Sequence, residues 1–377
     1  MSDLKRLMPI KRFMRIKLAV LMACALYVEM MSAAPAVACA ICVPYPKATL
    51  ADNLIKADAV IMARENPEKP YYFTPVEILK GTADEADFKG FIDSSSRRKL
   101  RLNSEHAVIF QRREAETGWK YVAYADTEYQ DFIRTIVKRS GGWQKNRIRN
   151  DRIAFFAKQL NRDHRYIQEQ AYLEVGRAPY SSIKVIAGSV PRDRIRGFLA
   201  DWRLIEWHSL YILMLGQSRH PEDIAYIRQK LEGAAKFGFK TNLSAWVTAF
   251  IEAYPDTGIE EIATLYFKKD DRTIEELEAV CIGLSVLGSE RSISAGPGIV
   301  NRRRRIVNIY AVLLNHHPIM ADWVAKDLTA WRIQALVDQL AEIREREPKH
   351  TSGSMFAVDY YLAVASNFLR LESTTTP

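Results

Sequence analysis

The sequence predicts an α+β protein in which a small β-rich domain precedes a helical domain. Between Asp52 and Asp126 the apolar residues recur with a period of two, which indicates short strands. After about Glu128 the period changes to that of amphipathic helices. Within the helical part, short apolar triplets recur at intervals of roughly 30 to 40 residues, the range of helical-repeat proteins. We therefore expect two architectures within one chain of 377 residues.

The N-terminal segment has the features of an export signal. Basic residues at positions 11, 12, 15 and 17 precede an apolar run from Leu18 to Val28, and Ala36 and Ala38 are the small residues before Cys39. A signal peptidase recognises this combination, and the run is shorter than the roughly 20 apolar residues that span a bilayer. We expect cleavage of residues 1–38 and a periplasmic or secreted protein without a transmembrane segment. A lipid anchor at Cys39 is the alternative fate of the cleaved chain.

Cys39 and Cys42 are each other's natural disulfide partners, because Cys24 lies in the signal and Cys281 in a distant helical segment. Two intervening residues permit a local disulfide, and an exported protein meets an oxidising compartment. A thiol redox site is an alternative, although Val43-Pro44-Tyr45-Pro46 blocks the helix that such a site needs. Haem attachment would need histidine after the second cysteine, and zinc would need two further ligands. We expect no cofactor and no metal.

The first domain, residues 39–127, is expected to be a small barrel or sandwich. A short helix over residues 50–59 precedes the strands. Turn-rich pieces, such as Glu65 to Pro70, separate the apolar runs. The expected strands cover residues 59–63, 71–79, 88–92, 99–102, 107–110 and 119–124.

The residues of this domain resemble the netrin-like barrels. The resemblance rests on the cysteine motif, on Leu54 to Ile61 and on Phe73 to Gly81. It implies an oligonucleotide/oligosaccharide-binding type of barrel, related to the tissue inhibitors of metalloproteinases. In those inhibitors the mature N-terminal cysteine chelates a protease zinc, and Cys39 would be the matching residue. This chain has Cys-x-x-Cys where the family usually has Cys-x-Cys.

The second part of the chain is expected to be helical throughout. Residues 128–160 are predicted to be connecting helices, with a stop at Gly141-Gly142. The helical-repeat domain is predicted over residues 161–370 and a disordered tail over residues 371–377. The recurring triplets are Ala171-Tyr172-Leu173, Leu210-Tyr211-Ile212, Ala245-Trp246-Val247, Val280-Cys281-Ile282 and Ile309-Tyr310-Ala311.

This region resembles HEAT-type helix-hairpin repeats in degenerate form. Proline stands near the start of several second helices, at Pro221, Pro255 and Pro318, where it costs no backbone hydrogen bond. Arrays of this kind bind a protein or peptide on their concave face. The resemblance therefore implies a protein or peptide partner, which for an exported protein lies in the cell envelope.

The charge of the chain excludes one large class of partner. The formal net charge is +9, but residues 1–38 contribute six basic residues against Asp3 and Glu29. The remaining chain is only mildly basic, which argues against a nucleic-acid groove.

Three groups of residues are candidate sites within the helical part. Arg302, Arg303, Arg304 and Arg305 form a run that would bind an anion, or would be a solvated helix start. Trp202, Trp207 and His208, with Glu206, would line a groove or belong to the core. His316 and His317 are adjacent, so their side chains diverge on a helix, and we expect no metal there.

Enzyme signatures are missing from the sequence. It contains no Gly-x-Ser-x-Gly, no His-Glu-x-x-His and no glycine-rich phosphate loop before a lysine. We therefore expect a non-enzymatic binding or scaffold protein. The alternatives are an inhibitor of a secreted metalloenzyme that acts through the free amine of Cys39, and a thiol-disulfide redox protein.

Overall fold

The computed structural model describes most of the chain after the expected signal. Residues 38–377 cluster as one compact unit. The described residues are 41, 48–82, 88, 90–114, 118–144, 150–290, 297–346 and 355–370. Cys39, Cys42, the signal segment and the expected tail lie outside these ranges. The disulfide, the export signal and the disordered tail therefore stay predictions.

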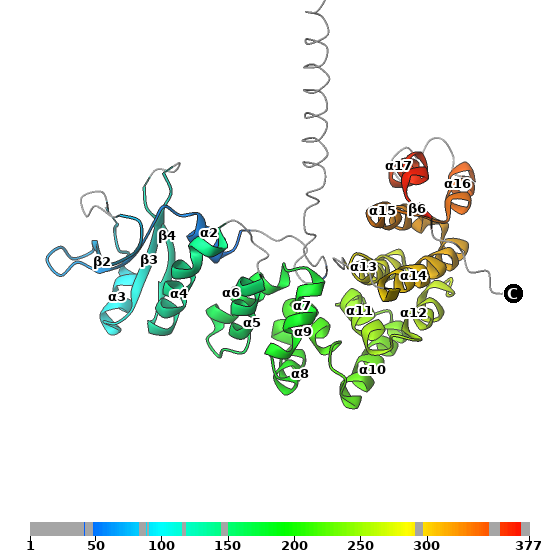
Figure 1. The fold of residues 1–377 in the computed structure, drawn as a ribbon. Helices are drawn as coiled ribbons and strands as arrows, with labels where there is room; N and C mark the ends of the chain where they lie inside the picture. The colour runs from blue at the N-terminus through cyan, green and yellow to red at the C-terminus, as the bar shows by residue number, and fades with distance from the viewer. Residues whose placement is uncertain are drawn as a thin grey trace, which may run out of the picture. The chain divides into compact units, whose positions relative to one another are not determined.

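Four antiparallel strands form an open sheet near the N-terminus (Figure 1). Their order is β2-β1-β3-β4, and β1 pairs with β3 so that Ile61 lies opposite Phe110. Among the described residues the two edge strands, β2 and β4, do not pair with each other, so the sheet is not closed. The expected barrel, and with it the resemblance to netrin-like domains, is therefore wrong. The strands are β1 Ala59–Glu65, β2 Phe73–Lys80, β3 Ala107–Arg112 and β4 Lys120–Ala125.

Two of the six expected strands do not form among the described residues, which leaves too few there to close a barrel. Residues 99–102 belong to helix α3, Ser94–Leu102. Asp93 starts this helix, because its carboxylate accepts hydrogen bonds from the amides of Ser95 and Ser96, both at 2.9 Å. The described residues of the segment 88–92 form an isolated bridge, between Tyr72 and Phe91, in place of the expected strand.

Helices cover both faces of the sheet. On one face, Val60 and Met62 of β1 join the core formed with α2, Leu50–Lys56, and α4, Thr127–Trp143. On the other face, Ile61 and Ala63 join a second cluster with Leu100 of α3. Leu100 is the one buried residue of α3, so this helix lies on the sheet through a single leucine and leaves its basic side chains near solvent.

The remainder of the described chain is almost entirely helical. Helix α4 continues through Gly141 and Gly142, where a stop was expected, and the connecting helix α5 follows. The helices are α5 Asn150–Gln159, α6 Arg165–Gly176, α7 Tyr180–Ile186, α8 Arg192–Ala200, α9 His208–Leu215, α10 Pro221–Phe237, α11 Leu243–Ala253, α12 Gly258–Ile262, α13 Ile274–Gly288, α14 Pro297–His316, α15 Ala321–Trp331, α16 Val337–Arg346 and α17 Phe356–Val364. The short elements are η1 Ala187–Ser189, η2 Trp202–Trp207, η3 Ala263–Phe267, η4 Pro318–Met320, η5 Ala365–Asn367, β5 Ile333–Gln334 and β6 Leu369–Arg370.

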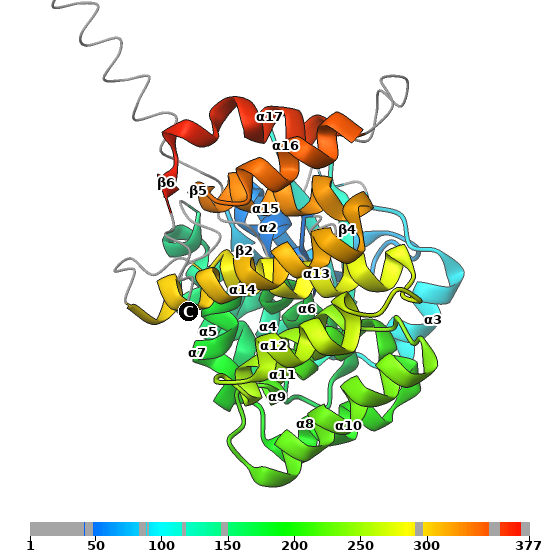
Figure 2. The same ribbon diagram turned by 90° about the vertical axis from the view of Figure 1, so that its right-hand side faces the viewer.

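Alternate helices form a continuous packed row. Helix α9 packs on α11, α11 on α13, α13 on α15 and α15 on α17, and Figure 2 shows this succession. Residues 209–215 of α9 are all buried, as expected for a helix covered on every side. Four of the five expected triplets lie on α6, α9, α11 and α13. The fifth, Ile309-Tyr310-Ala311, lies on α14, which packs against α13 and does not extend the row.

A buried ion network joins α2 to the helices that follow the sheet. Arg152 of α5 donates to Asp52 of α2 at 3.0 Å and to Glu174 of α6 at 2.8 Å. Arg177 also binds both carboxylates, so two guanidinium groups face two carboxylates. Thr49 caps α2 and donates its hydroxyl to Glu174. Arg152, Asp52 and Glu174 are 1%, 3% and 4% exposed. Water therefore does not stabilise these charges, and each charge is stabilised by its ion-pair partners.

Candidate anion-binding pocket

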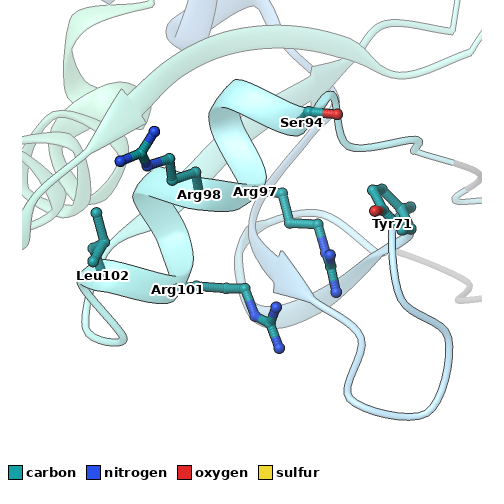
Figure 3. A pocket seen from close by; sticks show the side chains of 6 residues that line it. All are labelled: Tyr71, Ser94, Arg97, Arg98, Arg101 and Leu102. Carbon is teal, nitrogen blue, oxygen red and sulfur yellow. The ribbon is translucent and has the colours of Figure 1, made fainter.

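A pocket of about 260 Å³ lies beside helix α3. Three arginines dominate its wall, and none of the residues that line it is acidic. Figure 3 shows Arg97 pointing toward the ring of Tyr71, with Arg101 beside it and Arg98 and Leu102 on the other flank of the helix. The lining residues are Tyr71, Ser94, Arg97, Arg98, Arg101 and Leu102.

The helical repeat of α3 places its five lining side chains on one broad half of the helix, with Arg97 and Arg101 on the flank near Tyr71 and Arg98 and Leu102 on the other. Positions 94, 97, 98, 101 and 102 follow the spacing i, i+3, i+4, i+7 and i+8, which brings residues to the same side of a helix. Leu100 points the opposite way, into the cluster beneath the sheet. The Asp93 cap and the buried Leu100 therefore hold the helix, and the arginines face outward.

Arg97 is held in place by contacts from two sides. Its guanidinium forms an ion pair with Glu65 at the end of β1, and its central carbon lies 4.1 Å from the ring centroid of Tyr71. The hydrogen bond to Glu65 raises the pKa of Arg97. Burial raises the pKa of Glu65, but the hydrogen bonds from Arg97 and from the Tyr71 amide outweigh it and hold that pKa below its usual value. Both groups are charged at neutral pH.

Tyr71 reaches the pocket because of an unusual backbone conformation. Its φ is 70°, in the left-handed region that tyrosine rarely adopts. Its amide donates to Glu65 at 3.2 Å, and its ring stacks on Phe91 with centroids 6.2 Å apart. These two contacts hold Tyr71 beside Arg97. Strained backbone that the surroundings maintain is frequent at binding sites.

Arg98 and Arg101 carry the charge of the pocket that no ion pair in the described part neutralises, and Glu65 attracts Arg101 only at longer range. Both are exposed, and neither has a hydrogen-bond or ion-pair partner among the described residues. Since Arg97 is neutralised by Glu65, the pocket presents two guanidinium groups to solvent. A guanidinium binds carboxylate or phosphate oxygens through parallel N–H donors. The arrangement can therefore bind an anionic group that has an apolar neighbour, for which Tyr71 and Leu102 provide contacts.

The sequence does not predict this pocket, because residues 99–102 have the pattern of a strand. Arg97-Arg98-Lys99-Leu100-Arg101 has too few apolar residues for a clear helical period. The available signal was Asp93 followed by three serines, a combination typical of a helix start. Tyr71 carries no such signal, because its place in the pocket depends on contacts with Glu65 and Phe91.

The run Arg302 to Arg305 makes several contacts with its own chain. Arg302 forms an ion pair with Glu290 at 2.6 Å, and Arg303 donates to the Gly288 carbonyl at 2.6 Å. Arg305 donates to the Pro255 carbonyl and pairs with Glu260. Three of the four guanidinium groups thus hold α14 to its neighbours. Anion binding by this run stays a prediction, and an incoming anion would compete with these contacts.

The expected groove residues Trp202, Trp207 and His208 differ in their surroundings and in their exposure. Trp207 stacks on Tyr172, with ring centroids 5.0 Å apart. The His208 ring lies 3.1 Å from the Asp201 carbonyl oxygen, and both Trp207 and His208 are half-buried. Trp202 is 78% exposed. Of the three, only Trp202 is fully available to a partner.

The adjacent histidines and the cysteine of the described part are paired or buried. His316 pairs with Asp270 at 3.0 Å, whereas His317 is buried. Cys281 is buried, which raises the pKa of its thiol. Among the described residues no three His, Cys, Asp or Glu side chains gather in a way that could hold a metal ion. Inhibition through Cys39 and redox chemistry at Cys39 and Cys42 fall outside the described residues.

Asp327 of α15 is a buried carboxyl group in the helical core. It accepts hydrogen bonds from Ser285 at 2.6 Å and from the Tyr310 hydroxyl. Burial raises its pKa to about 6, although both hydrogen bonds act in the opposite direction. The folded protein therefore favours the protonated form more strongly than the unfolded chain does. Its contribution to stability is complete at pH values below the unfolded pKa and is lost as pH rises through 6.

We expect Asp327→Asn to remove this pH dependence. Between pH 7.5 and pH 5 the unaltered protein should gain about 1 kcal/mol of unfolding free energy from Asp327. The asparagine variant, which resembles the protonated acid, should lack this gain. Urea unfolding of both proteins at the two pH values measures the difference, and titrating histidines contribute equally to both. An identical pH dependence in the two proteins would contradict the assignment.

Comparison with known proteins identifies no relative. The chain matches no protein-family model, no curated protein and no solved structure. Neither the netrin-like nor the HEAT-type resemblance is therefore supported by a matching family. Among the described residues, none of the helices combines the length and apolar character that crossing a membrane requires.

Proposed function

We propose that this protein is a non-enzymatic binding protein, exported from the cytoplasm, that holds an acidic segment of a partner protein in the pocket beside α3. The observation that carries the proposal is the pair Arg98 and Arg101, which are exposed and form no hydrogen bond or ion pair among the described residues. The helical row, with its largely buried α9 and α11, serves as the scaffold.

The pocket favours a peptide carboxylate flanked by an apolar side chain. Its volume of about 260 Å³ accommodates one or two side chains. Leu102 and Tyr71 offer apolar surface next to the guanidinium groups, so an alternating acidic and apolar sequence satisfies both. Arg97, fixed by Glu65 and Tyr71, forms one wall and needs no rearrangement. Preformed geometry of this kind reduces the entropy cost of binding.

We expect Arg98→Gln/Arg101→Gln to weaken the binding of an acidic peptide by up to about thirtyfold, because each of the two exposed charge pairs contributes up to about 1 kcal/mol. The probe is a fluorescently labelled peptide of alternating glutamate and leucine, measured by anisotropy. A second peptide with glutamine in place of glutamate should bind weakly to both proteins. Raising the salt concentration should weaken binding of the acidic peptide to the unaltered protein.

The matched control is Arg203→Gln/Arg346→Gln, which removes the same net charge from the helical part. Both arginines are exposed and form local pairs, with Asp201 and Glu342. This variant should bind the acidic peptide as the unaltered protein does. An equal loss in both double variants would mean that only net charge matters. That result, or no binding by the unaltered protein, would refute the proposed site.

A further inference from the structure

The turn between α10 and α11 exposes an aromatic pair flanked by lysines. The aromatic tip is the sequence Lys236-Phe237-Gly238-Phe239-Lys240, and all five residues are exposed. Phe237 is 63% exposed and Phe239 is 61% exposed. Their ring centroids lie 5.8 Å apart, so the two rings form one apolar surface. Two neighbouring exposed phenylalanines have no packing explanation in the described part of the chain.

The backbone of the tip is well defined. Helix α10 ends at Phe237, and Gly238 has a φ of 69°, which glycine adopts without strain. The amides of Gly238 and Phe239 both donate to the carbonyl of Ala234. The buried residues of α10, among them Leu231 and Ala234, face the neighbouring helices. The chain therefore turns back sharply and leaves both rings at the end of the helix.

Positive charge stands on both sides of the rings. The Lys236 ammonium lies 5.2 Å from the ring centroid of Phe237. The Lys240 ammonium is 3.8 Å from a carboxylate oxygen of Glu275, and both side chains of this ion pair are exposed. An exposed pair at this distance contributes little, so Lys240 can exchange Glu275 for another anion.

Exposed apolar residues continue on the neighbouring connection. Asn242, just after the tip, donates to the Ile205 carbonyl in η2 at 3.3 Å. Ile205 and Trp202 of η2 are both exposed. The tip is thus tied to a second segment that carries an exposed indole.

We propose that the aromatic tip inserts into the interfacial region of an anionic lipid bilayer. Phenylalanine rings at a turn can enter the boundary between headgroups and acyl chains. Lysine side chains on either side extend their ammonium groups back to anionic headgroups while their methylene stems remain in apolar surroundings. The attachment is peripheral and independent of the arginine pocket of α3. It uses a surface that the proposed peptide binding leaves free.

Vesicle co-sedimentation tests this proposal. The protein is recovered from its native host, so that its N-terminus is processed as it is there. The vesicles contain phosphatidylcholine alone or equal parts of phosphatidylcholine and phosphatidylglycerol. The unaltered protein should bind the anionic vesicles, and Phe237→Ala/Phe239→Ala should lower the partition coefficient at least about tenfold. The matched control is Phe356→Ala on α17, where the phenylalanine is 78% exposed. This control should bind as the unaltered protein does. All of these proteins have the same N-terminus, so any contribution of the N-terminal apolar run to vesicle binding is the same in each.

The charges of the tip are tested separately. Lys236→Gln/Lys240→Gln should lower binding to the anionic vesicles by about fivefold for each lysine. Glu275→Gln releases Lys240 and should raise binding. No anionic vesicle binding by the unaltered protein overturns the proposal, as does equal binding by the Phe237→Ala/Phe239→Ala variant and the Phe356→Ala control. Equal binding to both vesicle types overturns the role of the lysines. None of these variants should change binding of the acidic peptide.

Discussion

Arg152→Met is expected to lower the free energy of unfolding by about 3–5 kcal/mol, the typical cost of removing one partner from a buried ion pair. The guanidinium of Arg152 binds Asp52 and Glu174 at distances of 2.8 to 3.0 Å. Without it, two buried carboxylates share the single charge of Arg177. The desolvation penalty of the second carboxylate is then no longer offset.

A second variant separates this explanation from simple loss of packing. Arg152→Met/Glu174→Gln removes one positive and one negative charge and leaves Arg177 paired with Asp52. The double variant should therefore be more stable than Arg152→Met alone. Urea unfolding followed by circular dichroism at pH 7 measures all three proteins. If the double variant is the less stable one, charge imbalance does not explain the loss.

An exposed arginine provides the control for this network. Arg162 forms an ion pair with Glu128 at 3.3 Å and donates a hydrogen bond to Gln159 at 3.3 Å, and the side chains of Arg162 and Glu128 are about half exposed. Arg162→Met should change the free energy of unfolding by less than about 1 kcal/mol. A similar loss for Arg152→Met and Arg162→Met would mean that burial adds nothing to the ion network.

The network also predicts a loss of stability in acid. Burial acts to raise the pKa of Asp52, but Arg177 and Arg152 outweigh it and hold that pKa well below its usual value. The contribution of Asp52 is therefore complete above the pKa of an unfolded aspartate and is lost as pH falls below it. Arg152→Met should weaken this dependence, because it removes one of the two cations that lower the pKa.

Gly288→Ala is expected to destabilise the protein by about 3 kcal/mol, at the upper end of the usual cost of overpacking. A Cβ atom at Gly288 would lie 2.1 Å from the Cζ2 atom of Trp331. The indole has little freedom to move, because it is buried, stacks on Tyr310 and donates to the Ser289 hydroxyl at 3.1 Å. Thermal and urea unfolding measure the loss.

Gly233→Ala is the matched control for this substitution. Gly233 lies within α10, and an added Cβ would meet nothing within 4 Å. Alanine should stabilise the helix there by about 1 kcal/mol. A companion variant, Gly288→Ala/Trp331→Leu, should lose less stability than the two single substitutions together, because the smaller side chain relieves the contact. Strict additivity would rule out a clash between these two residues.

The open sheet shows how far local pattern predicts this fold. The strands at Ala59–Glu65 and Ala107–Arg112 follow directly from their apolar runs, as do helices α2, α4 and α5. The pattern fails at residues 99–102, where Leu100 and Leu102 alternate with basic residues as they would in a strand. The Asp93 cap makes this segment helical, and the loss of that strand leaves the sheet open.

The candidate sites depend on tertiary contacts, which the pattern of residues along the sequence does not show. The Arg302 to Arg305 run was visible in the sequence, but three of its members bind Glu290, Glu260 and backbone carbonyls. Arg98 and Arg101 were not singled out in the sequence, yet they are exposed and form no hydrogen bond or ion pair among the described residues. Whether a basic side chain is available to a ligand depends on its neighbours in space.

The class of fold was determined by the sequence alone, since a period of two and a period of 3.6 arise from the geometry of single strands and helices. The tertiary structure alone decided that the sheet stays open, that Arg152 joins Asp52 across 100 residues of sequence, and that Tyr71 lies beside Arg97. These features depend on which surfaces meet. That is decided by packing and charge between segments distant in the chain, and no local period records it.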